Sequence, residues 1–154
     1  MITERETSLV VNTILTHARN ANIPVRPLKL QKLLYFFHGF YLRDNQAQGL
    51  LKESFYAWPY GPVIPSVYYH FRDQRDKPIG LLSELGGKAY IYSEKKTDVY
   101  KVLNNPMSGY WEKSDMELSD LTHRKNGAWY KAYEQGLRAE IKKDDIIDEF
   151  GANQ

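Results

Sequence analysis

The sequence predicts a mainly α fold, a compact helical domain packed around one central apolar helix, with a small two-stranded β element. The central helix is the strongest observation, because residues 28–43 are apolar almost all round the helical circumference. The strand prediction starts from Ser54–Trp58, whose residue types favour extended structure. With 154 residues the chain falls in the size range of one domain, so we expect a single domain over residues 1–154.

The first helix is predicted to begin near Thr3 and to end near Asn20. Thr3 and Glu6 have the spacing of a capping box, and apolar residues then recur at helical intervals. A short proline-containing link follows. Pro27 suits the first position of a second helix, because its fixed φ matches that of a helix. Proline lacks a backbone N–H, but an N–H at this position would have no acceptor within the helix.

The second helix, residues 28–43, has an apolar stripe that three further aromatic residues widen until little polar surface is left. A helix with this pattern belongs at the centre of a domain. The stripe and its extension are Leu30, Leu33, Leu34, Phe37 and Tyr41, with Tyr35, Phe36 and Phe40.

The β element is predicted to pair two distant segments. Ser54–Trp58 reads as a short strand that Pro59 stops, and residues 60–65 read as a rigid turn because each proline fixes its own φ. Lys88–Ser93 is the predicted partner strand. Pro65 is predicted to open a third helix.

The sequence of the second half of the chain predicts four further short helices. Residues 97–103 are helical in character, and Ser114 with Glu117 forms another capping box before the next helix. Residues 128–135 and 144–150 read as the last two helices, and each is followed by a glycine suited to a helix C-terminus.

Composition excludes several classes of protein. The chain has no cysteine, so it has no disulfide, thiolate metal site or cysteine nucleophile, which suits a reducing compartment and leads us to expect a cytoplasmic protein. No apolar run approaches the roughly 20 residues that span a bilayer. A net charge of +2 is too weak to indicate nucleic-acid binding.

The histidines and lysines give no pattern of a catalytic, metal or cofactor site. The four histidines lie on separate elements without metal-ligand spacing, and no nucleophile elbow or phosphate loop is present, so we expect no enzyme activity and no cofactor. His38 shares a helix face with Gln31 and is expected to be hydrogen-bonded there. His123 reads as a helix C-terminal cap. Lys29 and Lys32 are read as charges that reach solvent from buried stems, with anion binding as the alternative.

Four strings of sequence, taken in order, resemble the Panacea antitoxin domain family, whose members are also called SocA-like antitoxins or phage-associated GepA-like proteins. The strings are LKLQKLLYFFHGFYL at 28–42, AWPYGPVIPSVYYHF at 57–71, MELSDLTHRKNGAWYKAY at 116–133 and IIDEF at 146–150. The resemblance implies a shared scaffold of Leu30, Gln31, Lys32, Leu33, Tyr35, Trp58, Tyr60, Gly61, Pro62, Val63, Leu121, Thr122, His123 and Trp129.

The resemblance implies an antitoxin that neutralises its cognate toxin, encoded nearby and often in a prophage, by direct protein–protein binding. A second mechanism in the family is delivery of the toxin to a Clp-type protease, which would make the chain a proteolytic adaptor. A DNA-binding regulator and an uncharacterised enzyme are the alternatives from other classes. The oligomeric state stays open.

Two stretches depart from the family pattern. Arg26 stands where relatives often have a Thr or Ser that caps the second helix. Residues 97–111 match nothing typical of the family, and we predict that partner choice is encoded there by exposed aromatic residues, namely Tyr100, Tyr110 and Trp111. The turn at residues 58–65 is interpreted as a corner of the fold that packs on the core, and direct contact with a partner is the alternative.

Overall fold

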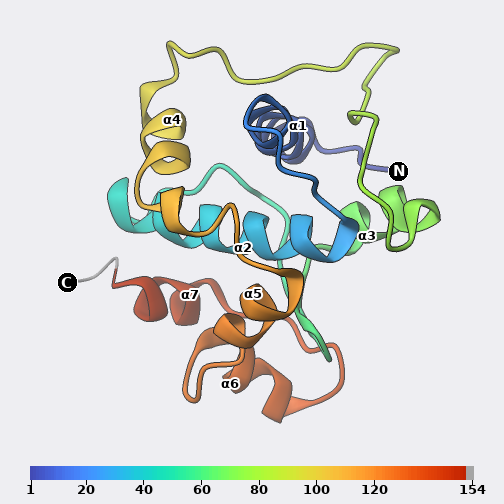
Figure 1. Ribbon diagram of the computed structural model, residues 1–154. Helices are drawn as coiled ribbons and strands as arrows, with labels where there is room; N and C mark the ends of the chain where they lie inside the picture. Colours follow the sequence, from blue (N-terminus) through green and yellow to red (C-terminus); the bar gives the residue numbers. More distant parts are fainter. Residues whose placement is uncertain (152–154) are drawn as a thin grey trace.

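The computed structural model describes residues 1–151 and confirms a mainly α fold (Figure 1). Among these residues no helix combines the length and apolarity that crossing a membrane requires. The elements are α1 (Arg5–Asn20), α2 (Pro27–Asp44), β1 (Tyr56–Trp58), β2 (Gly61–Val63), α3 (Pro65–Phe71), α4 (Thr97–Asn104), α5 (Asp115–Thr122), α6 (Ala128–Gln135) and α7 (Lys143–Phe150), with short 3-10 turns η1 (Arg72–Gln74) and η2 (Met107–Gly109).

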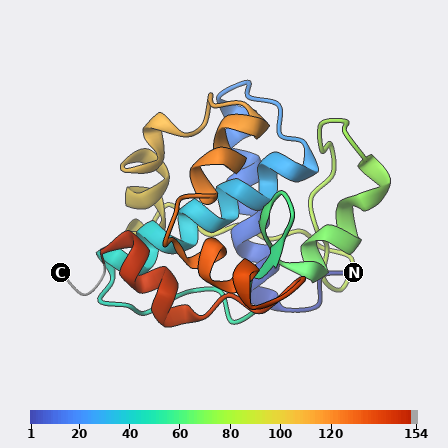
Figure 2. The same cartoon turned by 90° about the horizontal axis from the view of Figure 1, so that it is seen from below.

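Helix α2 is the central element, as its apolar circumference predicts. Every residue from Lys29 to Leu42 is buried, and α2 contacts α1, α3, α4, α5, α7 and β2. In the ribbon views α2 runs through the middle, with α1 and α4 on one side of it and α5, α6 and α7 on the other (Figures 1 and 2). Helices α1, α3, α4, α5 and α7 each bury one face against it, which is why their sequences show a narrower apolar stripe.

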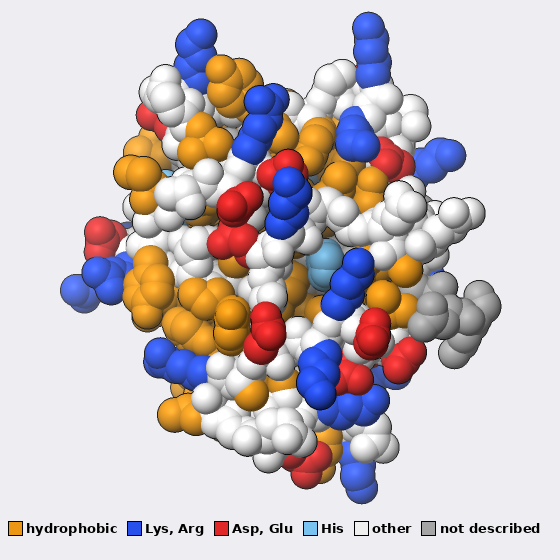
Figure 3. Space-filling view, turned by 180° about the vertical axis from the view of Figure 1, so that it is seen from behind, with side chains coloured by type: hydrophobic (Ala, Val, Ile, Leu, Met, Phe, Trp, Pro, Cys, Tyr) orange, Lys and Arg blue, Asp and Glu red, His pale blue; other side chains and the backbone are white. Residues whose placement is uncertain are grey.

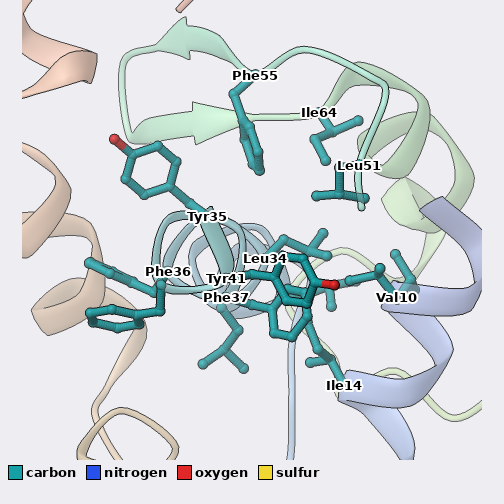
Figure 4. Close-up of a cluster of buried hydrophobic side chains, with 14 of the residues drawn as sticks. Val10, Ile14, Leu34, Tyr35, Phe36, Phe37, Tyr41, Leu51, Phe55 and Ile64 are labelled. Atoms are coloured by element: carbon teal, nitrogen blue, oxygen red, sulfur yellow. The ribbon is translucent and has the colours of Figure 1, made fainter. Parts of the chain in front are cut away.

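The core around α2 is rich in aromatic side chains. Val10 and Ile14 of α1 approach α2 from one side, while Phe55 and Ile64 approach from the chain on either side of the β-hairpin (Figure 4). Tyr35 packs edge-to-face against Phe55 with ring centroids 5.4 Å apart. Such edge-to-face pairs add specificity to the burial of large apolar area.

Local signals placed most helix ends correctly. Pro27 is the first residue of α2, and Ser114 with Glu117 forms the expected capping box at the start of α5. The predicted capping box at Thr3 is wrong, because α1 has Glu4 at its N-cap position and no side chain caps it. Arg26 likewise supplies no side-chain cap to α2.

The predicted pairing of Ser54–Trp58 with Lys88–Ser93 is wrong. Strand β1 pairs antiparallel with β2, which lies in the segment interpreted as a turn, and Ala57 faces Pro62 in the register. The Ala57 N–H points away from β2 and donates to the Ala139 carbonyl at 2.8 Å. Pro62 therefore occupies a position where the ladder needs no N–H, and a proline is tolerated there.

Residues 88–93 form hydrogen bonds with side chains of α1 and do not pair with β1. The Asn12 amide donates to the carbonyls of Ser83 and Tyr90 at 2.8 and 3.0 Å, and the Tyr92 N–H donates to the Thr13 hydroxyl at 2.9 Å. These polar side chains of α1 are buried. They satisfy the backbone of an irregular segment that crosses the helix, and so no strand partner is needed.

Candidate functional site

The β-hairpin is the feature on which the family-like residues converge. Its two-residue loop, Pro59 and Tyr60, connects Trp58 to Gly61. Gly61 has a φ of +119°, and a Cβ atom there would lie 2.7 Å from Thr122 Oγ1 and 2.8 Å from Lys32 Cε. Only glycine combines that backbone conformation with so close an approach of neighbouring side chains.

Three side chains from three different helices hold the backbone carbonyls of the hairpin. Lys32 Nζ of α2 donates to the Pro62 carbonyl at 2.9 Å. Ser119 Oγ of α5 donates to the Tyr60 carbonyl at 2.6 Å, and the Trp129 indole N–H of α6 donates to the Trp58 carbonyl at 2.8 Å. The hairpin is therefore fixed from both sides of its loop, and its conformation is determined by the core.

The hydrogen bonds from Lys32, Ser119 and Trp129 to the hairpin carbonyls form what we call the hairpin frame, and further polar contacts extend it. The Gln31 side chain makes both an acceptor and a donor bond to the backbone of Ile64, at 2.9 and 3.2 Å. The Tyr35 hydroxyl donates to Glu149 Oε1 at 2.8 Å, and the same oxygen accepts the Ala128 N–H at the start of α6. Burial, reinforced by the Glu149 charge, raises the pKa of Tyr35 well above its usual value. Glu149 thus joins α7, α6 and α2.

Lys32 is wholly buried, which corrects the expectation that its charge reaches solvent. Its ammonium has one acceptor among the described residues, the Pro62 carbonyl. Removal from water penalises the charged form and lowers the pKa of Lys32 to about 7. A side chain buried to this extent leaves an anion in solvent no access to the ammonium group. Lys29 is buried as well, and its pKa is lowered mainly by desolvation.

His123 follows the last residue of α5, but its ring does not act as a charged cap. The ring stacks on Trp129 with centroids 3.9 Å apart, and Nε2 is buried without a hydrogen-bond partner among the described residues. Burial first, then the Lys32 charge, lower the pKa of His123. The neutral imidazole is therefore favoured, and its role is packing.

The remaining family-like residues support the same frame from the interior. Thr122 Oγ1 donates to the Ser119 carbonyl at 2.6 Å, directly beneath Gly61. The others are apolar: Leu30, Leu33 and Val63 are buried, and Leu121 is half-buried. Sequence reasoning missed Ser119 and Glu149, because a polar residue on a helix gives no signal of a partner far along the chain.

An open groove of about 560 Å³ runs along the outer side of the hairpin. Leu28, Leu30 and Val63 and, from α3, Val67 and Phe71 provide apolar lining. The outer aromatics are Trp58, Tyr60 and Tyr68; Tyr60 is 63% exposed and Tyr68 40% exposed. Trp58 and Tyr68 pack edge-to-face at 4.8 Å. In the view from behind, hydrophobic side chains gather on the side that carries α3 and the hairpin, with basic side chains next to them (Figure 3).

Three arginines are the charged residues that line this groove. Arg72 and Arg75 come from the end of α3 and the η1 turn, and Arg138 comes from the loop between α6 and α7. All three are exposed, and none forms an ion pair with another described residue. The Arg138 guanidinium lies over the Trp58 ring, 4.2 Å from its centroid. That cation–π contact orients the arginine along the groove.

Comparison with known proteins identifies the family. The model of the SocA-like antitoxin Panacea domain matches residues 30–130, from the start of α2 to the first turn of α6. The chain belongs to the SocA-like Panacea antitoxin family. Antitoxin SocA of Caulobacter vibrioides is 32% identical over 127 residues, which cover 78% of this chain and 66% of the relative. No solved structure gives a significant match.

The Panacea match contains the hairpin and the three residues whose side chains hold it, Lys32, Ser119 and Trp129. It also contains Arg72 and Arg75, whereas Arg138 and Glu149 lie beyond its end. The groove is therefore completed by a loop outside the matched region, and that loop contributes the arginine that stacks on Trp58.

The expectation that Tyr100, Tyr110 and Trp111 are exposed is wrong, because Trp111 is buried and both tyrosines are half-buried. Trp111 is 5% exposed, its indole N–H donates to the Leu103 carbonyl at 2.9 Å, and its ring packs on His17. Tyr110 is half-buried against Phe36. Tyr100 is half-buried too, and its hydroxyl donates to the Tyr92 carbonyl at 2.6 Å. Partner contact through these three residues stays a prediction.

His38 differs from expectation in its partner. Gln31, on the same face of α2, bonds to Ile64, while the His38 ring packs on Phe55 with centroids 5.5 Å apart. Burial and the Lys143 charge lower the pKa of His38 to about 4. His38 also lines a surface hollow with Lys143 and Asp144. Among residues 1–151 no cluster of three or more histidine or acidic side chains could hold a metal ion.

Proposed function

We propose that this protein is an antitoxin that neutralises its cognate toxin by binding it directly in the cytoplasm, as a binding protein without enzyme activity. The toxin is expected to be encoded beside it, in a bacterial or prophage locus. Membership of the Panacea family and the relation to antitoxin SocA support the antitoxin role. The chain spans 66% of the length of this relative.

One observation supports direct binding: the domain presents the exposed Tyr60 and the half-buried Trp58 on a hairpin that its core holds rigid. Tyr60 stands at the hairpin loop with Trp58 beside it, and the carbonyls of both residues are held by side chains of α5 and α6. A rigid aromatic surface loses little conformational entropy when it binds, which is what interface anchors require. A half-open groove beside it offers space for a segment of the partner.

The experiment is co-expression with the protein from the neighbouring reading frame that is toxic when expressed alone. We expect growth to be rescued, and the two proteins to copurify as a complex of defined stoichiometry. Rescue without a detectable complex would contradict direct neutralisation.

Delivery to a Clp-type protease is the second mechanism in this family, and the same experiment separates it. In a host that lacks the Clp-type protease, direct neutralisation predicts full rescue with undiminished toxin levels. An adaptor predicts loss of rescue in that host and rapid loss of the toxin in the parent host. The matched control is a Tyr60→Ala, Tyr68→Ala variant, which is expected to fold normally and to rescue in neither host.

A further inference from the structure

The groove beside the hairpin is lined by apolar side chains and by charged side chains that are all positive. We propose that it is the toxin-binding surface and that its occupant is an acidic segment of the toxin that carries an aromatic or aliphatic side chain. This inference rests on the proposed function and adds the surface and the chemistry of the partner.

The aromatic part of the groove is built to receive an apolar side chain. Trp58 and Tyr68 form one wall, and Val67 and Phe71 of α3 lie among the lining residues. Trp, Tyr and Arg are the residue types that most often contribute the largest share of binding energy at protein interfaces, and this groove has all three. Its outer residues make few bonds to the fold, so binding would not disrupt the domain.

The charges specify an acidic partner. Arg72, Arg75 and Arg138 are the charged residues that line the groove, and no carboxylate among the described residues pairs with them. Four ion pairs occur elsewhere in the described chain, so these arginines are set apart from that pattern. Exposed arginines can bind carboxylates through two parallel hydrogen bonds, which gives direction as well as attraction.

A second copy of this chain does not fit the groove. A symmetric dimer through this surface would set the three arginines against those of the other copy, and like charges facing each other oppose association. A nucleic acid is also less suited, because the net charge of the chain is only +2. An acidic protein segment matches both the charge and the apolar lining.

The test reverses two of the arginines and compares them with a matched charge reversal elsewhere. The test variant is Arg75→Glu with Arg138→Glu, and the control is Lys88→Glu with Lys95→Glu, at exposed positions in the segment between η1 and α4. Both variants change the net charge equally. The probe is the purified toxin of the neighbouring reading frame, and binding is measured by calorimetry at two salt concentrations after melting curves confirm folding.

We expect the test variant to bind the toxin at least tenfold more weakly than wild type, with the control within threefold. Wild-type affinity should fall as salt is raised, and substituting lysine for acidic residues of the toxin should restore binding to the test variant. Equal affinity of wild type and test variant overturns this inference while leaving direct neutralisation intact, whereas failure of the wild type to bind overturns the proposed function itself. Binding of a single-stranded oligonucleotide that is lost in the test variant, with toxin binding unchanged, also overturns the inference.

Discussion

The buried ammonium group of Lys32 makes the stability of this protein depend on pH in a direction that can be stated in advance. The group lies beneath Gly61 with the Pro62 carbonyl as its acceptor, and burial lowers its pKa to about 7. In the unfolded chain a lysine has a pKa of about 10.4. Between these two values the unfolded state binds a proton that the folded state does not, so the free energy of unfolding rises with pH.

The magnitude follows from the same two pKa values. Lys32 contributes its least stability below pH 7, where both states are protonated, and the deficit disappears as pH rises toward the unfolded value. Between pH 7 and pH 9 the wild-type free energy of unfolding should therefore increase by about 2 kcal/mol. Lys32→Met keeps the approximate length and the apolar stem of the side chain but removes the group that titrates. The contribution of this position to the free energy of unfolding should therefore be constant from pH 7 to pH 9 in the variant. The lost hydrogen bond to Pro62 costs about 1 to 3 kcal/mol, which offsets much of the relief from removing a buried charge.

The measurement is urea unfolding of wild type and Lys32→Met at pH 7, 8 and 9, followed by circular dichroism. The quantity of interest is the difference between the two proteins, because titration of other groups cancels in it. The tyrosines with raised pKa values, Tyr35 and Tyr41, destabilise the fold only at higher pH. If the difference between the two curves is constant from pH 7 to pH 9, the ammonium group is not desolvated and the reasoning about the hairpin frame is refuted.

Three further substitutions test the packing. Gly61→Ala should destabilise the fold by about 2 kcal/mol, because it adds a Cβ atom 2.7 Å from Thr122 Oγ1 at a positive φ. The control is Gly109→Ala, where the added Cβ atom meets open space. Equal melting temperatures for the two variants would contradict the close approach at Gly61. Leu34→Ala should cost about 2 to 5 kcal/mol through a cavity at the centre of α2, and an unchanged thermal melt would show that this helix is not central. Trp111→Ala should lower the free energy of unfolding by about 3 to 5 kcal/mol, as judged by the chemical denaturation midpoint. Normal stability combined with lost toxin binding would instead place the interface at residues 97–111.

Helix positions could be read from the sequence because their signals are local. Pro27 starts α2, Ser114 with Glu117 caps α5, and Gly151 ends α7 in a left-handed conformation. Each signal acts within one turn of helix. The apolar circumference of α2 is also a local pattern, and it identified the centre of the domain without knowledge of any partner helix.

Strand pairing and side-chain exposure depend on contacts far apart in the chain, and there the sequence was a poor guide. Pro62 looked like a turn residue, yet it lies in β2 and pairs with Ala57, whose N–H is taken up by the distant Ala139 carbonyl. Trp111 looked like a surface anchor, yet its burial is determined by Leu103 and by His17 of α1. No pattern within a short window contains that information.

The structure gives a physical reason why residues near the hairpin divide into two groups. Lys32, Ser119 and Trp129 donate hydrogen bonds to hairpin carbonyls, so replacing any one of them leaves a polar group unpaired and weakens the fold. Tyr60 and Arg75 face the groove, and their side chains make no hydrogen bond to another described residue. A change at these outward positions alters what the groove can bind while the frame stays intact. The interior contacts that hold the hairpin and the side chains that face the groove can therefore be changed independently of each other.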